Sequence, residues 1–65
     1  MTTRFFCNGL QGTKDSVRAL FARFALAQGY TSQEVRDIWD QACEPAGEEF
    51  RDVLLEFGVE IQITH

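Results

Sequence analysis

The chain has 65 residues and a mass of 7.4 kDa; 45% of its residues are hydrophobic, 25% are charged, and it contains one Pro and five Gly. This length and composition fit one globular domain spanning residues 1–65 and exclude long disordered segments. No apolar run approaches the roughly 18 residues that cross a bilayer, and no signal peptide is recognisable, so we expect a cytoplasmic protein with no membrane partner. A domain this small buries only about 60% of the surface of its unfolded chain, which favours assembly with a second copy or another protein.

The two halves of the chain carry opposite charge. Residues 1–31 contain four basic side chains and one acidic side chain, a net charge of +3, whereas residues 32–65 contain two arginines and nine carboxylates, a net charge of −7. This asymmetry bears on what the surface attracts rather than on the fold.

A short strand is predicted first, over residues 3–7, because these residues are rich in β-branched and aromatic side chains, and Asn8–Gly9 should end it. Successive strand side chains face opposite sides. Either Phe5 or Phe6 should therefore leave the core, to anchor a partner or a second copy or to lie under the loop at Leu10.

A helix is predicted from about residue 14 to residue 28, followed by Gly29 as a left-handed C-cap. Its apolar residues recur at helical spacing. They are Val17, Leu20, Phe21, Phe24 and Ala25.

The second helix has a clear start signal. Thr31 can accept a hydrogen bond from the amide of Glu34, the Glu34 carboxylate can accept one from the amide of Thr31, and Tyr30 can pack on Val35. The predicted buried side consists of Val35, Ile38, Trp39 and Ala42, and the helix should close at Cys43 because Pro45 restricts the residue before it.

Pro45 is expected to open a third helix with Phe50, Val53, Leu54 and Phe57 on its apolar side. Gly58 should end this helix in a Schellman motif that brings Val59 against Leu54. Residues 59–64 then alternate strictly, which predicts a half-buried strand with Val59, Ile61 and Ile63 facing inward.

These elements predict an α+β fold: a short N-terminal strand, three amphipathic helices and a C-terminal strand. The two strands should pair against the helical layer or add to the same edge of a second copy, since an isolated two-stranded ribbon is barely stable. A homodimer is therefore one expected state.

Residues typical of catalysis or metal binding are sparse and scattered. Cys7 and Cys43 lack metal-ligand spacing and are expected to be reduced and to act as small hydrophobic core residues. The only histidine, His65, is terminal. Glu48 and Glu49 point to different sides of a helix, and the glycines before Lys14 lack phosphate-loop spacing. We therefore expect no catalytic residues, no metal, no cofactor and no enzymatic activity.

Part of the chain resembles a helix-turn-helix. Over residues 21–40, Ala25, Gly29, Thr31, Val35 and Ile38 match that family's pattern of a small residue, a turn glycine, a cap and two core apolar residues. The resemblance implies a dimeric DNA-binding regulator whose second helix enters the major groove. The outward positions of that helix include Glu34, Asp37 and Asp40 against the single Arg36, which is the wrong sign for DNA, so direct nucleic-acid binding is not expected.

Acidic side chains follow the outward flanks of the second and third helices at three- and four-residue spacings. Together with Arg36, which is set among them, the candidate partner-binding residues are Glu34, Asp37, Asp40, Glu44, Glu48, Asp52 and Glu56, with Glu49 beside the second row. Arg36 and Arg51 would temper the repulsion between carboxylates or pair with acidic groups on a partner. The alternative is an interaction protein or structural protein whose acidic face is solvated and only keeps the chain soluble.

In size, acidity and lack of an active site, the chain resembles the small single-domain proteins that phages encode against host nucleic-acid machinery, anti-CRISPR proteins among them. The resemblance implies a cytoplasmic inhibitor in a bacterial host cell. Its acidic helices would dock on a basic nucleic-acid-binding surface of a host defence complex, where complementary potential speeds encounter and fixes orientation.

Overall fold

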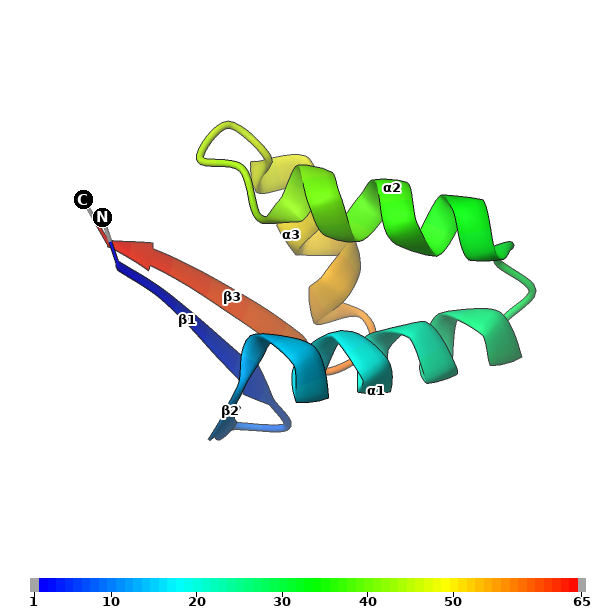
Figure 1. Ribbon diagram of the computed structural model, residues 1–65, viewed down its shortest axis with the longest axis horizontal. Helices are drawn as coiled ribbons and strands as arrows, with labels where there is room; N and C mark the ends of the chain where they lie inside the picture. Colours follow the sequence, from blue (N-terminus) through cyan, green and yellow to red (C-terminus); the bar gives the residue numbers. More distant parts are fainter. Residues whose placement is uncertain (1, 65) are drawn as a thin grey trace.

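A computed structural model describes residues 2–64 as three helices packed against one face of a three-stranded antiparallel sheet (Figure 1). In chain order the elements are β1 (Thr2–Cys7), β2 (Leu10–Gly12), α1 (Lys14–Ala27), α2 (Ser32–Ala42), α3 (Glu48–Leu55) and β3 (Val59–Thr64). The predicted α+β fold and the predicted order of its elements are confirmed, with β2 as an addition.

The first and last strands pair with each other inside one chain. The sheet order is β2-β1-β3, and the β1–β3 ladder runs antiparallel from Thr2 opposite Thr64 to Cys7 opposite Val59. The two ends of the chain therefore lie side by side at one corner of the molecule (Figure 1). Of the two strand arrangements left open by the sequence, the structure has the intramolecular one.

The strand β2 is an element that the sequence analysis missed. Asn8 and Gly9 have φ angles of 52° and 84°, and Cys7 lies opposite Leu10, so these two residues form the turn of a β-hairpin. Positive φ at both central residues is what a type I′ turn requires, and Asn-Gly is its preferred sequence. The prediction that Asn8–Gly9 only ends the first strand was therefore incomplete.

The boundaries of α1 and α2 follow the predicted capping signals. The Thr13 hydroxyl accepts from the Ser16 amide (3.2 Å) at the start of α1. Beyond its end, the amide of Gly29 donates to the Leu26 carbonyl and the amide of Tyr30 to the Ala25 carbonyl. These two bonds make a Schellman motif, and Gly29 at φ 100° confirms the predicted left-handed C-cap.

The capping box of α2 is also confirmed. The Thr31 hydroxyl accepts from the amide of Glu34 (3.1 Å), and the Glu34 carboxylate accepts from the amide of Thr31 (3.0 Å). Thr31 thereby satisfies one of the free amides of the first turn.

The predicted start and end of α3 were wrong. Pro45 does not open the helix; it lies in the turn after Cys43, and α3 begins at Glu48 with Gly47 as its N-cap. Gly47 is buried, and a Cβ atom there would overlap the carbonyl oxygen of Gln41, so this close approach sets where α3 can begin. At the other end, the amides of residues 56–58 donate to carbonyls three residues back, and Val59 enters β3 opposite Cys7 instead of completing a Schellman motif.

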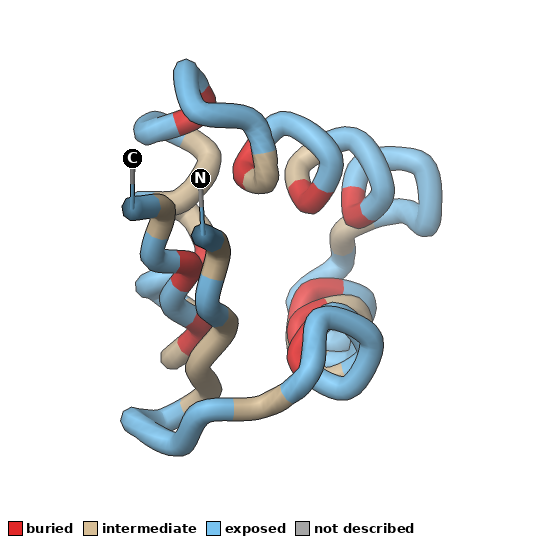
Figure 2. Tube along the Cα trace, turned by 60° about the vertical axis from the view of Figure 1, so that its left-hand side comes forward, coloured by how far each residue is buried: buried red, intermediate tan, exposed pale blue. Residues whose placement is uncertain are grey.

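The core lies between the sheet and the helices, where Trp39 of α2 contacts both. Its ring stacks on Phe5 of β1 (centroids 5.7 Å apart) and on Phe21 of α1 (6.1 Å). Figure 2 shows the buried positions on the inward sides of the helices and the sheet. The predicted inward positions of all three helices and of β3 are at least half-buried.

Phe5 faces this core, so Phe6 points to the opposite side of the sheet, as strand alternation predicts. Phe6 lies in register with Gln11 of β2 and Glu60 of β3 and is half-buried. Leu10 does not cover it, because Leu10 is in register with Cys7 and Val59, which belong to the helix-facing side.

We predict that Gly47→Ala destabilises the fold by about 2 to 3 kcal/mol, because the added methyl group must displace the backbone of α2. Urea unfolding followed by Trp39 fluorescence measures this. Ala46→Ser, at the exposed neighbouring position, should change stability by less than about 0.5 kcal/mol. Equal stabilities of the two variants would contradict this account of Gly47.

Candidate functional site

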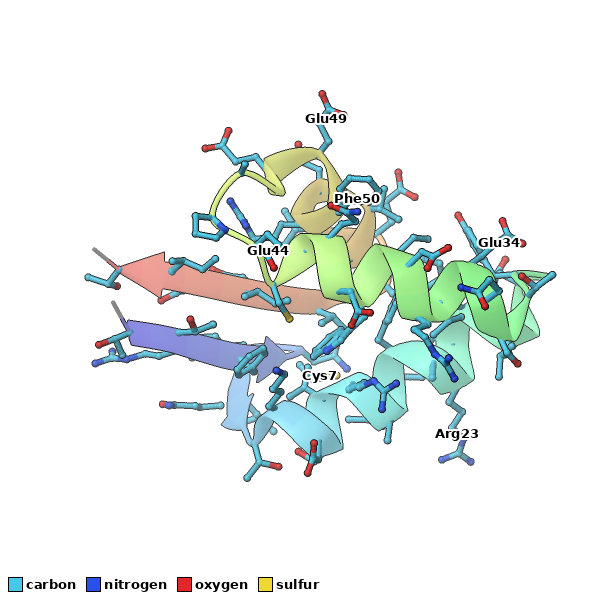
Figure 3. All side chains as sticks on the ribbon, turned by 45° about the horizontal axis from the view of Figure 1, so that its top comes forward. Cys7, Arg23, Glu34, Glu44, Glu49 and Phe50 are labelled. Carbon is cyan, nitrogen blue, oxygen red and sulfur yellow. The ribbon has the colours of Figure 1, made fainter. Side chains whose placement is uncertain are left out.

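The acidic residues of α2, α3 and the segments that follow them are all exposed. We call this set the acidic face: Glu34, Asp37, Asp40, Glu44, Glu48, Glu49, Asp52 and Glu56. Figure 3 shows Glu34 and Glu44 toward opposite ends of α2 and Glu49 pointing outward from α3. Both helices thus present their carboxylates to solvent, as the sequence predicts.

The carboxylates wrap around the two helices instead of forming two straight rows. Glu34 and Glu56 both border the depressions beside Gln28 and Tyr30, at the turn between α1 and α2. Glu48 and Asp52 line a separate depression on the β3 side of α3. Asp40 lies near Cys43, and both Asp40 and Lys14 of α1 are within electrostatic range of the Cys43 thiol.

Two members of the acidic face already have local hydrogen-bond partners. The carboxylate of Glu34 holds the capping box of α2, and that of Asp37 accepts from the Gln33 side chain at 3.0 Å. Both residues remain exposed. Their outer lone pairs are free for a partner, but Glu34 also has a structural role that the sequence pattern had already suggested.

Glu60 adds a carboxylate that the sequence analysis did not include. It lies on β3 and lines the same depression as Glu48 and Asp52, with its carboxylate accepting from the Gln62 side chain at 2.7 Å. The alternating pattern of residues 59–64 placed Glu60 on the outward side of its strand. It gave no indication that this strand lies beside α3.

Arg51 borders the depression of Glu48, Asp52 and Glu60, but its guanidinium is bound to backbone carbonyls. It is half-buried, and its guanidinium donates to the carbonyl oxygens of Ala42 (3.0 Å), Glu44 (2.6 Å) and Pro45 (3.1 Å). These carbonyls belong to the end of α2 and the following turn, where a cation also opposes the negative end of the helix dipole. These bonds to the backbone of its own chain were not predicted from the sequence.

Arg36 is exposed but does not lie within the acidic rows. It lines the groove between α1 and α2, together with Arg18 and Asp15. Within residues 2–64, no Lys or Arg nitrogen lies within 4.0 Å of a carboxylate oxygen. The acidic face is therefore not neutralised by ion pairs, and its like charges repel at a cost of about 0.2 to 0.5 kcal/mol per neighbouring pair on a helix.

The two cysteines are free, half-buried and packed against the core. Burial raises the pKa of the Cys43 thiol, so this group is held in its neutral form. In the part of the chain that the structure describes, no three His, Cys, Asp or Glu side chains come together as metal ligands. His65, the third member of the Cys-Cys-His set considered from sequence, lies outside the described residues.

No protein family, curated protein or solved structure matches this chain. Among the described residues, none of the helices combines the length and apolar character needed to cross a membrane.

We predict that Arg51→Ala lowers the free energy of unfolding by about 2 kcal/mol, because three carbonyl groups lose a charged donor. Arg36→Ala removes the same charge from an exposed site without such bonds and should change stability by less than about 0.5 kcal/mol. Urea unfolding of both variants tests the assignment. Similar losses for the two would mean that charge, and not capping of α2, explains Arg51.

Proposed function

We propose that this chain is a non-enzymatic, protein-binding inhibitor whose acidic face docks on a basic nucleic-acid-binding surface of another protein. One observation carries the proposal. The two cations of α2 and α3 are engaged elsewhere: Arg36 lines the groove beside α1, and Arg51, although it borders the depression of Glu48 and Asp52, donates to backbone carbonyls. The carboxylates consequently act together at the surface, without partners of opposite charge.

Such a surface suits a partner that ordinarily holds phosphates. A groove lined by Lys and Arg attracts closely spaced negative charges, and complementary potentials raise the association rate and orient the complex. Carboxylates on two packed helices offer that spacing on a preformed scaffold, which limits the entropy lost on binding. We propose that the partner is a host defence complex, because the chain resembles phage inhibitors in size and acidity.

The unpaired charges also support the proposal energetically. Repulsion along a helix lowers stability, and a domain of this size has little stability to spare. Solubility alone needs a net charge of only moderate size, with both signs interspersed. A surface on which acidic residues are separated from basic ones is not required for solubility, and we attribute it to binding.

We predict that proteins captured from a bacterial lysate by the immobilised chain include nucleic-acid-binding proteins and are released by added duplex DNA or RNA. Binding should weaken steeply between about 0.01 M and about 1 M salt, where the Debye length falls from about 30 Å to about 3 Å. Two variants with the same increase in net charge distinguish the effect of the acidic face from the effect of net charge alone. The face variant carries Asp37→Asn, Asp40→Asn, Asp52→Asn and Glu56→Gln. The control variant carries Thr2→Lys, Gln11→Lys, Gln62→Lys and Thr64→Lys, all at exposed positions of the strands.

The face variant should lose capture at least tenfold, and the control variant should retain it. Equal capture by both variants, or capture that nucleic acid does not displace, would overturn the proposal. Equal capture would leave the acidic face as a solvated surface.

The helix-turn-helix alternative is tested by a gel shift with duplex DNA at low salt. We expect no shift, because the exposed side of α2 presents Glu34, Asp37 and Asp40 to the phosphates. A shift that weakens with salt and with Arg36→Ala would favour the DNA-binding regulator instead.

A further inference from the structure

The groove between α1 and α2 combines apolar groups with positively charged ones. It has a volume of about 300 Å³, and its lining includes Ala19, Ala22 and Val35, with Leu26 half-exposed. Arg18 from α1 and Arg36 from α2 both line it. The groove therefore has one arginine on each of its sides, with Asp15 on the side of Arg18, and apolar side chains in its lining.

Neither arginine is used within the described part of the chain. Arg18 and Arg36 make no side-chain hydrogen bond and no ion pair within 4.0 Å among residues 2–64. The only carboxylate in the groove, Asp15, lies three residues before Arg18 on the same helix and offsets one of the two charges. The arginine pair therefore leaves a net positive site that fits a carboxylate next to an apolar side chain.

The same chain displays that combination elsewhere. Leu55 on α3 is 54% exposed and lines a depression of about 340 Å³ that Arg51 also borders. Carboxylates outnumber this one cation there, because Leu55 shares the depression with Glu48, Asp52 and Glu60. We call this set of four residues the Leu55 edge. Only three large apolar side chains are exposed among residues 2–64, and two of them, Leu26 and Leu55, lie in surroundings of opposite charge.

We propose that the groove between α1 and α2 binds the Leu55 edge of a second copy of this chain. Leu55 of one copy would pack beside Leu26 and the small side chains of the other, while Glu48 and Asp52 face Arg18 and Arg36. Arginine is the residue best suited to such contacts, because its planar guanidinium can bind a carboxylate through two parallel hydrogen bonds. Burial of both leucines would add apolar contact to the charge pairing.

This contact uses different residues of each copy, so its partners can be separated by mutation. It also extends beyond the proposed inhibitory function, because Arg18, Arg36 and Leu26 do not belong to the acidic face. Glu48 and Asp52 belong to both surfaces. A second copy and a basic partner would therefore compete for α3.

Charge-reversed variants test the proposal. Sedimentation equilibrium of the wild-type chain at low salt should show reversible self-association that is lost near 1 M salt, where screening is strong. A groove variant, Arg18→Glu with Arg36→Glu, and an edge variant, Glu48→Lys with Asp52→Lys, should each associate at least tenfold more weakly. The control, Arg4→Glu with Arg23→Glu, has the same net charge as the groove variant and should associate like the wild type; Arg23 points away from the rest of the molecule (Figure 3).

A mixture of the groove variant and the edge variant should associate again, because the intact groove of one then meets the intact edge of the other. A monomeric wild type at low salt, or a mixture that stays monomeric while the control associates, would overturn the proposal. Circular dichroism of each variant establishes that it is folded. The groove variant keeps the acidic face, so loss of its self-association with retained capture of a basic partner distinguishes this inference from the proposed function.

Discussion

The stacking of Trp39 between Phe5 and Phe21 holds the three parts of this fold together. One side chain of α2 contacts β1 on one side and α1 on the other, and its ring is 1% exposed. Aromatic rings supply a large buried area per residue, which matters in a chain too short for an extensive core. The indole N–H has no hydrogen-bond partner among the described residues. Burial of the ring therefore includes the desolvation penalty of an unsatisfied donor.

Because the sheet and α1 both pack on the inner side of α2, the outer sides of α2 and α3 are left to solvent. Those outer sides carry the acidic face. Of the cations on the same helices, Arg51 binds backbone carbonyls and Arg36 lines the groove beside α1. Arg51 donates at the turn after α2, where the chain reverses: to the carbonyls of Ala42 and Pro45, and to that of Glu44, which also accepts from the amide of Gly47. The charge pattern of the surface is thus partly a result of how the loop between α2 and α3 is stabilised.

The features predicted correctly from sequence are those encoded by neighbouring residues. The capping box of Thr31 and Glu34 and the left-handed C-cap at Gly29 depend on residues only a few positions apart, so their sequence pattern determines their geometry. The exposure of the acidic residues followed from helical periodicity in the same way.

The errors concern contacts between distant residues or weak local signals. Arg51 reaches Ala42, nine residues away, and no local pattern distinguishes it from a surface arginine. The contact between Gly47 and Gln41 overrides the preference of Pro45 for the first position of a helix. The strand β2 has only three residues, Leu10–Gly12, and its signal was the Asn-Gly turn before it rather than its own composition. The position of Glu60 beside α3 likewise depends on how the sheet meets the helices.

The ladder between β1 and β3 joins the two most distant segments of the chain, and this has a consequence for synthesis in the cell. The hairpin and the capped helices involve only local contacts and can begin to form as the chain emerges from the ribosome. The central strand acquires its second neighbour only when Val59–Thr64 have left the exit tunnel. Until then, the edge of β1 and the aromatic residues behind it stay uncovered, so the sheet is completed only after all three helices have been synthesised.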